Sequence, residues 1–228
     1  MKKNNMILWW GFWLIYLEVL YKFFIVKNLF SLNSLTVILF TIPWIVFFSI
    51  LTSIFNKKAN RILNIILTFS VIIFTLAQIV YYNFYNSMFS FFSLTGGGTG
   101  QVFQFYTMII EVIIRIWYIF ILVLIPVIIS IIFRKKINYE RVSYKKILLY
   151  LGFFMLSFCG IILQCNLDKS LYSTKRLIKN TYSSMLTINK TGLLTMEALD
   201  FYRFIFGFEE QLIIENKEIG RASCRERV

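Results

Sequence analysis

Five long apolar stretches, separated by short polar connections, dominate the pattern of this chain. They cover residues 7–25, 35–55, 62–82, 108–133 and 147–165, and each is at least nineteen residues long. An α-helix rises about 1.5 Å per residue, so about twenty residues are needed to cross a hydrocarbon core of about 30 Å. The pattern predicts an all-α polytopic membrane protein whose five transmembrane helices occupy residues 1–165.

The connections between these stretches alternate between strongly basic and nearly uncharged. Short connections that carry Lys and Arg stay on the cytoplasmic side of a membrane. Only Lys27 lies between the first and second stretches, and the connection 83–107 contains no charged residue. Eleven basic residues flank the stretches on the other side: Lys2, Lys3, Lys57, Lys58, Arg61, Arg134, Lys135, Lys136, Arg141, Lys145 and Lys146. We therefore expect a cell-membrane protein with its amino terminus inside and everything after residue 165 outside the cell.

Composition excludes an ordinary soluble domain. The chain is 58% hydrophobic and 19% aromatic, and its mean hydropathy is +0.71. A net charge of +13 is compatible with nucleic-acid binding. Most of the basic residues, however, lie next to the spans, where attraction to anionic lipid headgroups stabilises membrane binding by about 1 kcal/mol per Lys or Arg. We expect membrane lipids and not nucleic acid as partners.

A further apolar segment follows the last stretch. Residues 193–208 contain nine Leu, Ile, Phe and Tyr side chains, and their charged residues are Glu197, Asp200 and Arg203. Such a segment is too apolar for a free linker. It predicts an amphipathic juxtamembrane helix that lies in the outer interface or under a further domain, within an extracellular linker of residues 166–216. Residues 217–228 are rich in Arg, unlike the rest of the chain, and we expect them to be a non-native tail.

Few polar side chains interrupt the apolar stretches, and an ionisable group inside a bilayer is costly unless it is paired or wetted. Glu18 and Lys22 lie one turn apart in the first stretch, and Glu111 and Arg115 lie one turn apart in the fourth. Gln78 lies near the outer end of the third. Two interpretations stay open.

In the first interpretation, each acid only neutralises its neighbouring base. In the second, these five residues form a polar site for lipid headgroups in the outer leaflet, where the planar guanidinium of Arg115 contacts a lipid phosphate. The chain contains no His, and we assign it no catalytic residue, no metal ligand and no cofactor.

The order of the stretches, the aromatic segment after the third, and the basic connection before the fifth resemble the membrane region of the lipoteichoic acid synthase family. The resemblance covers almost the whole chain up to about residue 216. The residues that carry it are Tyr82, Asn83, Phe84, Tyr85, Phe91, Phe92, Ser93, Leu94, Asn189, Lys190, Thr191, Gly192, Leu193, Leu194, Thr195 and Asp200.

This resemblance implies a phosphoglycerol transferase of the sulfatase and alkaline phosphatase superfamily in the cell membrane of a Gram-positive bacterium. Such enzymes move glycerol phosphate from phosphatidylglycerol to a polymer on a glycolipid anchor. Their chemistry resides in an extracellular domain that holds manganese or magnesium, which we expect to follow residue 216. The chain would then position that domain and be inactive alone. Its partners would be phosphatidylglycerol, the glycolipid anchor and cell-envelope synthesis proteins.

Two other functions fit the same pattern. One is a small polytopic transporter, although the polar residues cluster toward one leaflet and no internal repeat is evident. The other is a partner-binding membrane protein without catalytic activity, which would use its aromatic loops as the contact surface.

Overall fold

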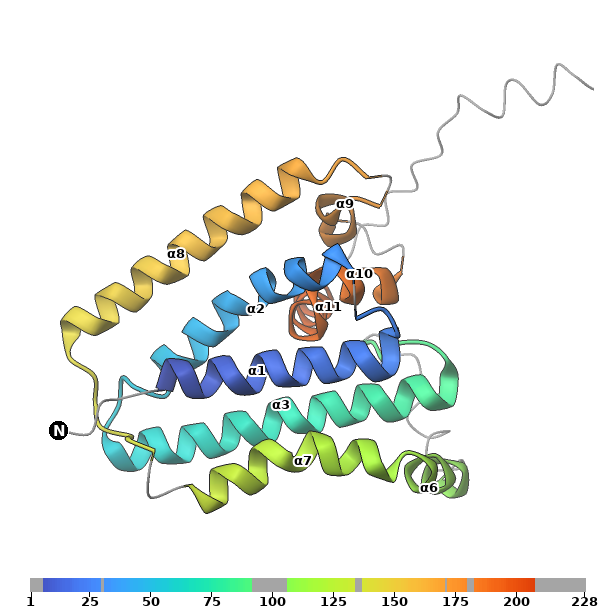
Figure 1. The fold of residues 1–228 in the computed structure, drawn as a ribbon, viewed down its shortest axis with the longest axis horizontal. Coiled ribbons are helices and arrows are strands. Elements are labelled where there is room, and N and C mark those ends of the chain that lie inside the picture. The colour runs from blue at the N-terminus through green and yellow to red at the C-terminus, as the bar shows by residue number, and fades with distance from the viewer. Residues whose placement is uncertain are drawn as a thin grey trace, which may run out of the picture.

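The computed structural model describes residues 6–29, 31–91, 106–133, 137–170, 172–179 and 183–207. Within these ranges every regular element is a helix and none is a strand, which confirms the all-α class (Figure 1). The non-native tail expected at 217–228, and the end of the linker from residue 208 onward, lie outside the described residues.

Four helices are long and apolar enough to cross a membrane. The first is α1 (Met6–Tyr21), which continues into the π-helical turn η1 (Lys22–Val26). The others are α2 (Leu32–Leu51), α3 (Lys57–Tyr85) and α8 (Tyr144–Leu167). They correspond to the first, second, third and fifth apolar stretches. The long α3 ends at Asn86, which adopts a left-handed conformation (φ 52°) that Asn tolerates better than most residues.

The fourth stretch is not one straight helix, contrary to the sequence prediction. It forms α6 (Tyr106–Arg115) and α7 (Trp117–Ile132), which meet at Ile116 with a bend of 77°. Glu111 and Arg115 therefore lie on α6 and not within a continuous span. A straight helix would carry these two charges deep into its apolar run, and the bend separates them from it. The molecule has five candidate spans if the bent pair counts as one.

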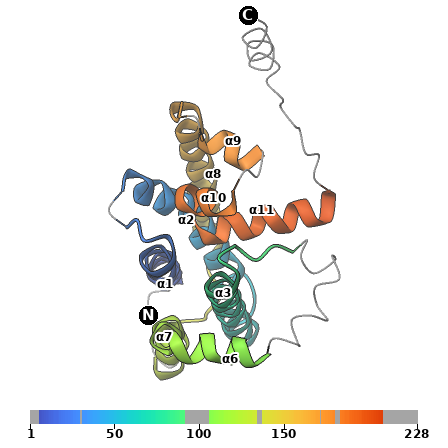
Figure 2. The same cartoon turned by 90° about the vertical axis from the view of Figure 1, so that its right-hand side faces the viewer.

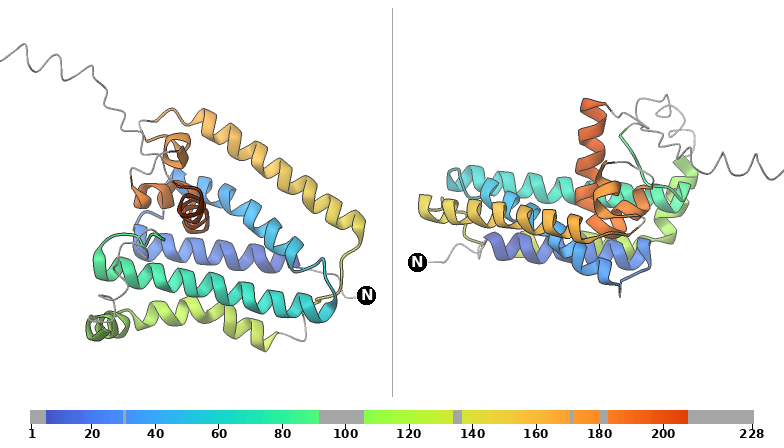
Figure 3. Two further views of the ribbon diagram at one scale, coloured as in Figure 1. Left: turned by 180° about the vertical axis from the view of Figure 1, so that it is seen from behind. Right: turned by 90° about the horizontal axis from the view of Figure 1, so that it is seen from above.

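Three shorter helices complete the fold: α9 (Thr174–Lys179), α10 (Ser184–Thr191) and α11 (Leu193–Phe206). They gather at one end of the bundle, which we call the C-terminal end (Figures 1 and 3). The opposite, N-terminal end holds the start of α1 and the connections from α2 to α3 and from α7 to α8. Seen along α1 and α3, helices α6 and α11 run across the bundle instead of along it (Figure 2).

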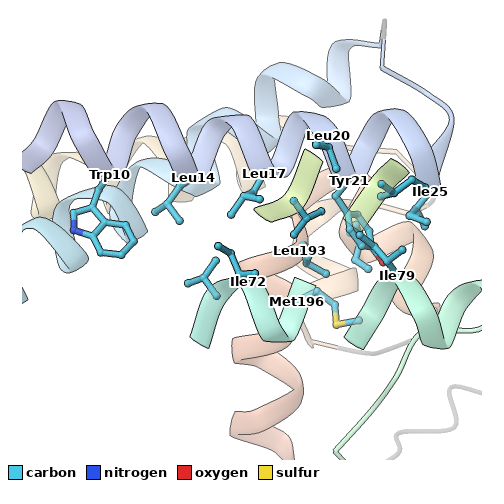
Figure 4. Close-up of a cluster of buried hydrophobic side chains, with 14 of the residues drawn as sticks. Trp10, Leu14, Leu17, Leu20, Tyr21, Ile25, Ile72, Ile79, Leu193 and Met196 are labelled. Atoms are coloured by element: carbon cyan, nitrogen blue, oxygen red, sulfur yellow. The ribbon is translucent and has the colours of Figure 1, made fainter. Parts of the chain in front are cut away.

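The core joins the long helices to the first turn of α11. Figure 4 shows Leu17 and Tyr21 of α1 on the side that faces Ile79 of α3, with Leu193 and Met196 of α11 beside them. All five side chains are buried. The segment after the last span is thus packed into the bundle by the apolar side chains that begin it, while its far end, including Tyr202 and Phe206, stays exposed.

Helix α8 lies at the edge of the molecule and packs on α2 (Figure 1). Its buried residues are Tyr150 and Ser157. Gly160 gives the close approach, since a Cβ there would lie 3.4 Å from Leu39 Cδ1. Large apolar side chains such as Leu148 and Leu156 are exposed, as expected for a helix that faces hydrocarbon.

Candidate functional site

Glu18, near the end of α1, binds the start of α11. Its Oε2 accepts a hydrogen bond from the backbone N–H of Leu193 at 2.8 Å, and its Oε1 accepts one from Leu194 at 3.0 Å. Glu18 is only 6% exposed. The first N–H groups of a helix have no partner within the helix, and they carry its partial positive charge. A carboxylate from another helix therefore satisfies them both by hydrogen bonding and by charge.

Lys22, one turn after Glu18, binds α10, the helix that precedes α11. Its Nζ donates a hydrogen bond to the backbone carbonyl of Asn189 at 3.2 Å, in the last turn of α10. A cation is favourable at that position because the carbonyl end of a helix carries partial negative charge. The two charges of the first span thus have backbone partners outside it, a possibility absent from both sequence interpretations.

Gly192 joins α10 to α11 at the point of contact. Its φ is +87° and its ψ is 167°, a conformation that L side chains rarely adopt. A Cβ at this position would also lie 2.9 Å from Glu18 Oε1. We call the group formed by Glu18, Lys22 and the junction at Gly192 the clamp.

Gln78 holds the segment that follows α3. Its Nε2 donates to the carbonyl of Phe89 at 3.0 Å, and its Oε1 accepts from the Phe89 N–H at 3.1 Å. Asp200 of α11 binds the same segment, accepting from Ser90 Oγ at 2.8 Å and from the Phe91 N–H at 2.7 Å. The sequence analysis named Gln78 as a polar group near one end of the third apolar stretch, and in the structure its contacts are with the chain itself.

Asp168 and Lys190 tie the end of α8 to α9 and α10. Lys190 Nζ lies 2.7 Å from Asp168 Oδ2 and also donates to the carbonyl of Tyr172. Asp168 accepts from the N–H and the hydroxyl of Thr174, at the start of α9. Partial burial opposes ionisation of Asp168, but the hydrogen bonds from Lys190, Ser170 and Thr174 outweigh it and hold the pKa of Asp168 well below its usual range.

A cavity of about 320 Å³ lies beside the clamp, between α2, α3 and α11. Its walls are almost entirely apolar and include Trp44, Phe74 and Phe201. Glu197 also lines it, and Glu197 Oε1 is buried without a hydrogen-bond partner. Burial, together with the charges of Glu18 and Asp200, raises the pKa of Glu197 to about 8. Near neutral pH the surroundings of this carboxyl therefore favour its protonated form.

Glu111 and Arg115 stand apart from the clamp. Both are exposed on α6, which has no buried residue. The structure therefore brings Glu18 and Lys22 together with the junction of α10 and α11, and leaves Glu111 and Arg115 on a separate helix at the same end of the molecule (Figure 2). An exposed guanidinium on a helix that crosses the bundle is free to meet a ligand from outside the protein.

Glu197 and Asp200 are polar residues of this region that sequence reasoning did not assign to the site. The signal was present, because they are two of the three charges in an otherwise apolar segment. Within the described ranges, no three His, Cys, Asp or Glu side chains are grouped so that they could hold a metal ion. The polar contacts described here hold α10, α11 and the segment after α3 in position against the long helices.

The fold defines the class of protein as an all-helical chain with four or five helices that are compatible with membrane insertion. No known protein family, curated protein or solved structure matches the chain.

Proposed function

We propose that this chain is the membrane-embedded part of a lipoteichoic acid synthase-like phosphoglycerol transferase. In this proposal the five spans insert with the amino terminus inside, and the C-terminal end faces the exterior. The chain anchors an extracellular sulfatase-like domain and positions it over phosphatidylglycerol and the glycolipid acceptor. Manganese or magnesium would be bound by that domain and not by this chain.

The clamp is the observation that supports an anchoring role. A transferase whose donor and acceptor are both lipids gains from being held at a fixed distance from the surface where they are concentrated. A flexible linker after the last span would not fix that distance. Here the segment after α8 is bound back to α1 by Glu18 and Lys22 and by the burial of Leu193 and Met196. The helix from which a following domain would continue is thus held by the spans.

The same contacts favour an anchor over a transporter. Polar side chains that line a transport path must remain available to the transported substrate. In this chain Glu18, Lys22 and Gln78 instead bind the backbone of segments outside the long helices. Their role in the fold is to connect α10, α11 and the segment after α3 to the bundle.

Reconstitution tests the proposed function. The full-length protein, including the domain expected after residue 216, is placed in vesicles that contain phosphatidylglycerol labelled in its headgroup glycerol. With manganese or magnesium, we expect transfer of labelled glycerol phosphate and release of diacylglycerol, and residues 1–216 alone should give neither product. Transfer by residues 1–216, or no transfer by the full-length protein with either metal, would contradict the proposal.

Arg115 is expected to contact a lipid phosphate during this reaction. Its guanidinium suits two phosphate oxygens at once, and it is exposed at the C-terminal end. Arg115→Leu in the full-length protein should lower glycerol phosphate transfer by about tenfold, the effect of losing one charge-assisted contact, with unchanged membrane insertion. Lys27→Leu, which removes another exposed cation at this end, serves as the control. Equal transfer by both variants and the wild type would remove Arg115 from the site.

A further inference from the structure

A second cavity, of about 240 Å³, lies between α3 and α7 at the N-terminal end of the bundle, away from the clamp. Figure 1 shows these two helices side by side, with the start of α3 and the end of α7 at this end. Its lining combines the apolar side chains Ile65, Phe69, Val127 and Ile131 with polar groups from Arg61, Asn64, Thr68, Ser130 and Tyr139.

Asn64 is the unusual member of this lining. Its side chain is 1% exposed, and neither its Nδ2 nor its Oδ1 has a hydrogen-bond partner. Buried amide groups are nearly always hydrogen-bonded, because an unpaired donor or acceptor costs free energy in an apolar surrounding. A buried amide that lines a cavity and lacks both kinds of partner points to an occupant that supplies an acceptor and a donor.

The preceding asparagine on the same face of α3 shows that the chain can satisfy such a group. Asn60 is also fully buried, but its Oδ1 accepts from the Phe55 N–H at 3.0 Å. Its Nδ2 donates to the carbonyls of Phe55 at 2.8 Å and Tyr139 at 3.0 Å. Asn60 thereby links the connection before α3 to the connection before α8. Asn64, one turn further along α3, lines the cavity and has no such partners.

Two hydroxyl groups in the lining, those of Thr68 and Ser130, already have partners. Thr68 Oγ1 donates to the carbonyl of Asn64 at 2.7 Å, and Ser130 Oγ donates to that of Pro126 at 2.6 Å. The protons of these two hydroxyl groups are thus used within their own helices, and neither group has a hydrogen bond with Asn64. The chain itself therefore leaves the amide of Asn64 without a partner.

Charge and shape identify the kind of ligand. Arg61 lines the cavity with its guanidinium 5.8 Å from the centre of the Tyr139 ring, and Lys57 and Lys58 occupy the preceding turn of α3. An anion is favoured at this end, whereas the walls further along α3 and α7 are hydrocarbon. A water molecule bonded to Asn64 would leave the apolar walls formed by Ile65, Phe69 and Val127 without a contact. The volume is below the roughly 300 to 1,000 Å³ typical of pockets for whole small molecules, so it fits part of a larger amphiphile.

We propose that an anionic phospholipid binds between α3 and α7, and that the buried Asn64 side chain turns into the cavity so that a phosphate oxygen accepts hydrogen bonds from Asn64 Nδ2 and the Arg61 guanidinium. A hydroxyl of the headgroup donates to Asn64 Oδ1, and an acyl chain lies along Ile65, Phe69 and Val127. The lipid belongs to the leaflet at the N-terminal end, so this site is separate from the proposed lipid chemistry at the C-terminal end.

Lipid retention tests this site. The protein is purified from bilayers that contain phosphatidylcholine with a minor fraction of phosphatidylglycerol, and the lipids that remain bound are measured by native mass spectrometry. We expect the wild type to retain phosphatidylglycerol over phosphatidylcholine by about tenfold. Asn64→Leu and Arg61→Gln should each abolish that preference. Lys57→Gln, which removes a nearby cation that does not line the cavity, should keep it.

A melting experiment separates loss of binding from loss of folding. In pure phosphatidylcholine, Asn64→Leu should be at least as stable as the wild type, because it removes an unpaired buried amide. Arg61→Gln changes an exposed residue and tests the site even if Asn64→Leu does not fold. Equal retention of the two lipids by the wild type, or an unchanged preference in both variants, would overturn the proposal. Neither result depends on whether the protein transfers glycerol phosphate.

Discussion

Replacing Glu18 with Leu is expected to release α10 and α11 from the bundle. The variant leaves the N–H groups of Leu193 and Leu194 without acceptors in a buried setting, and it removes the negative charge that opposes the partial positive charge of α11. Hydrogen bonds to a charged group contribute about 1.5 to 3 kcal/mol each. The two together should lower the free energy of unfolding by about 3 kcal/mol or more.

Limited proteolysis and thermal unfolding in one detergent measure this effect. Cleavage within residues 183–207 should become much faster in Glu18→Leu than in the wild type, and the melting temperature should fall. Glu18→Gln should lie between the two, since its amide keeps one acceptor but places its own donors near the helix. Glu111→Leu, an exposed acid on α6 at the same end, is the matched control. If Glu18→Leu and Glu111→Leu resist the protease equally well, the clamp does not hold these helices.

Gly192→Ala should destabilise the same junction for two separate reasons. The backbone conformation at Gly192 costs an L residue about 1 to 3 kcal/mol, and the new Cβ would stand 2.9 Å from Glu18 Oε1. The carboxylate would have to move away from the two N–H groups it accepts from. We expect a loss of stability comparable to that of Glu18→Leu, again with exposure of α10 and α11 to protease.

Substitutions at two other glycines distinguish backbone strain from the contact with Glu18. Gly207 has a similar φ of +78°, but a Cβ there meets nothing within 4 Å, so Gly207→Ala reports conformational strain alone. Gly152 lies within α8 with open space around it, and Gly152→Ala should be neutral or slightly stabilising because Ala favours a helix. A Gly192→Ala protein that melts no lower than Gly207→Ala would show that the contact with Glu18 adds nothing.

The long helices could be predicted from the sequence because their signal is local. Stretches such as 62–82 are continuous and apolar, and length alone assigns them. The break at Ile116 could not be predicted in the same way, since it contains neither Pro nor Gly. Pro43 and Pro126, the residues most expected to interrupt a helix, lie inside α2 and α7 without ending them. Ile116 at the break is buried in the core, and that tertiary contact is not contained in a linear pattern.

The candidate site was predictable only as a set of residues. Glu18, Lys22 and Gln78 were recognisable because a polar group in an apolar run is conspicuous, but their partners are backbone atoms from other parts of the chain. Asn64 left a weaker signal: Asn60, Asn64 and Thr68 recur every four residues and so share one face of α3. Sequence spacing shows that they share a face, but it does not show that Asn60 has partners and Asn64 has none.

Glu18 emerges from the ribosome 175 residues before Leu193, whose N–H it accepts. At a synthesis rate of about 5 to 20 residues per second, roughly 10 to 35 s pass before the acid meets its donors. Throughout that interval the nascent protein carries an incompletely satisfied first helix. Assembly is therefore completed last at the place where it began, and a nascent chain that ends before residue 189 leaves both Glu18 and Lys22 without these partners.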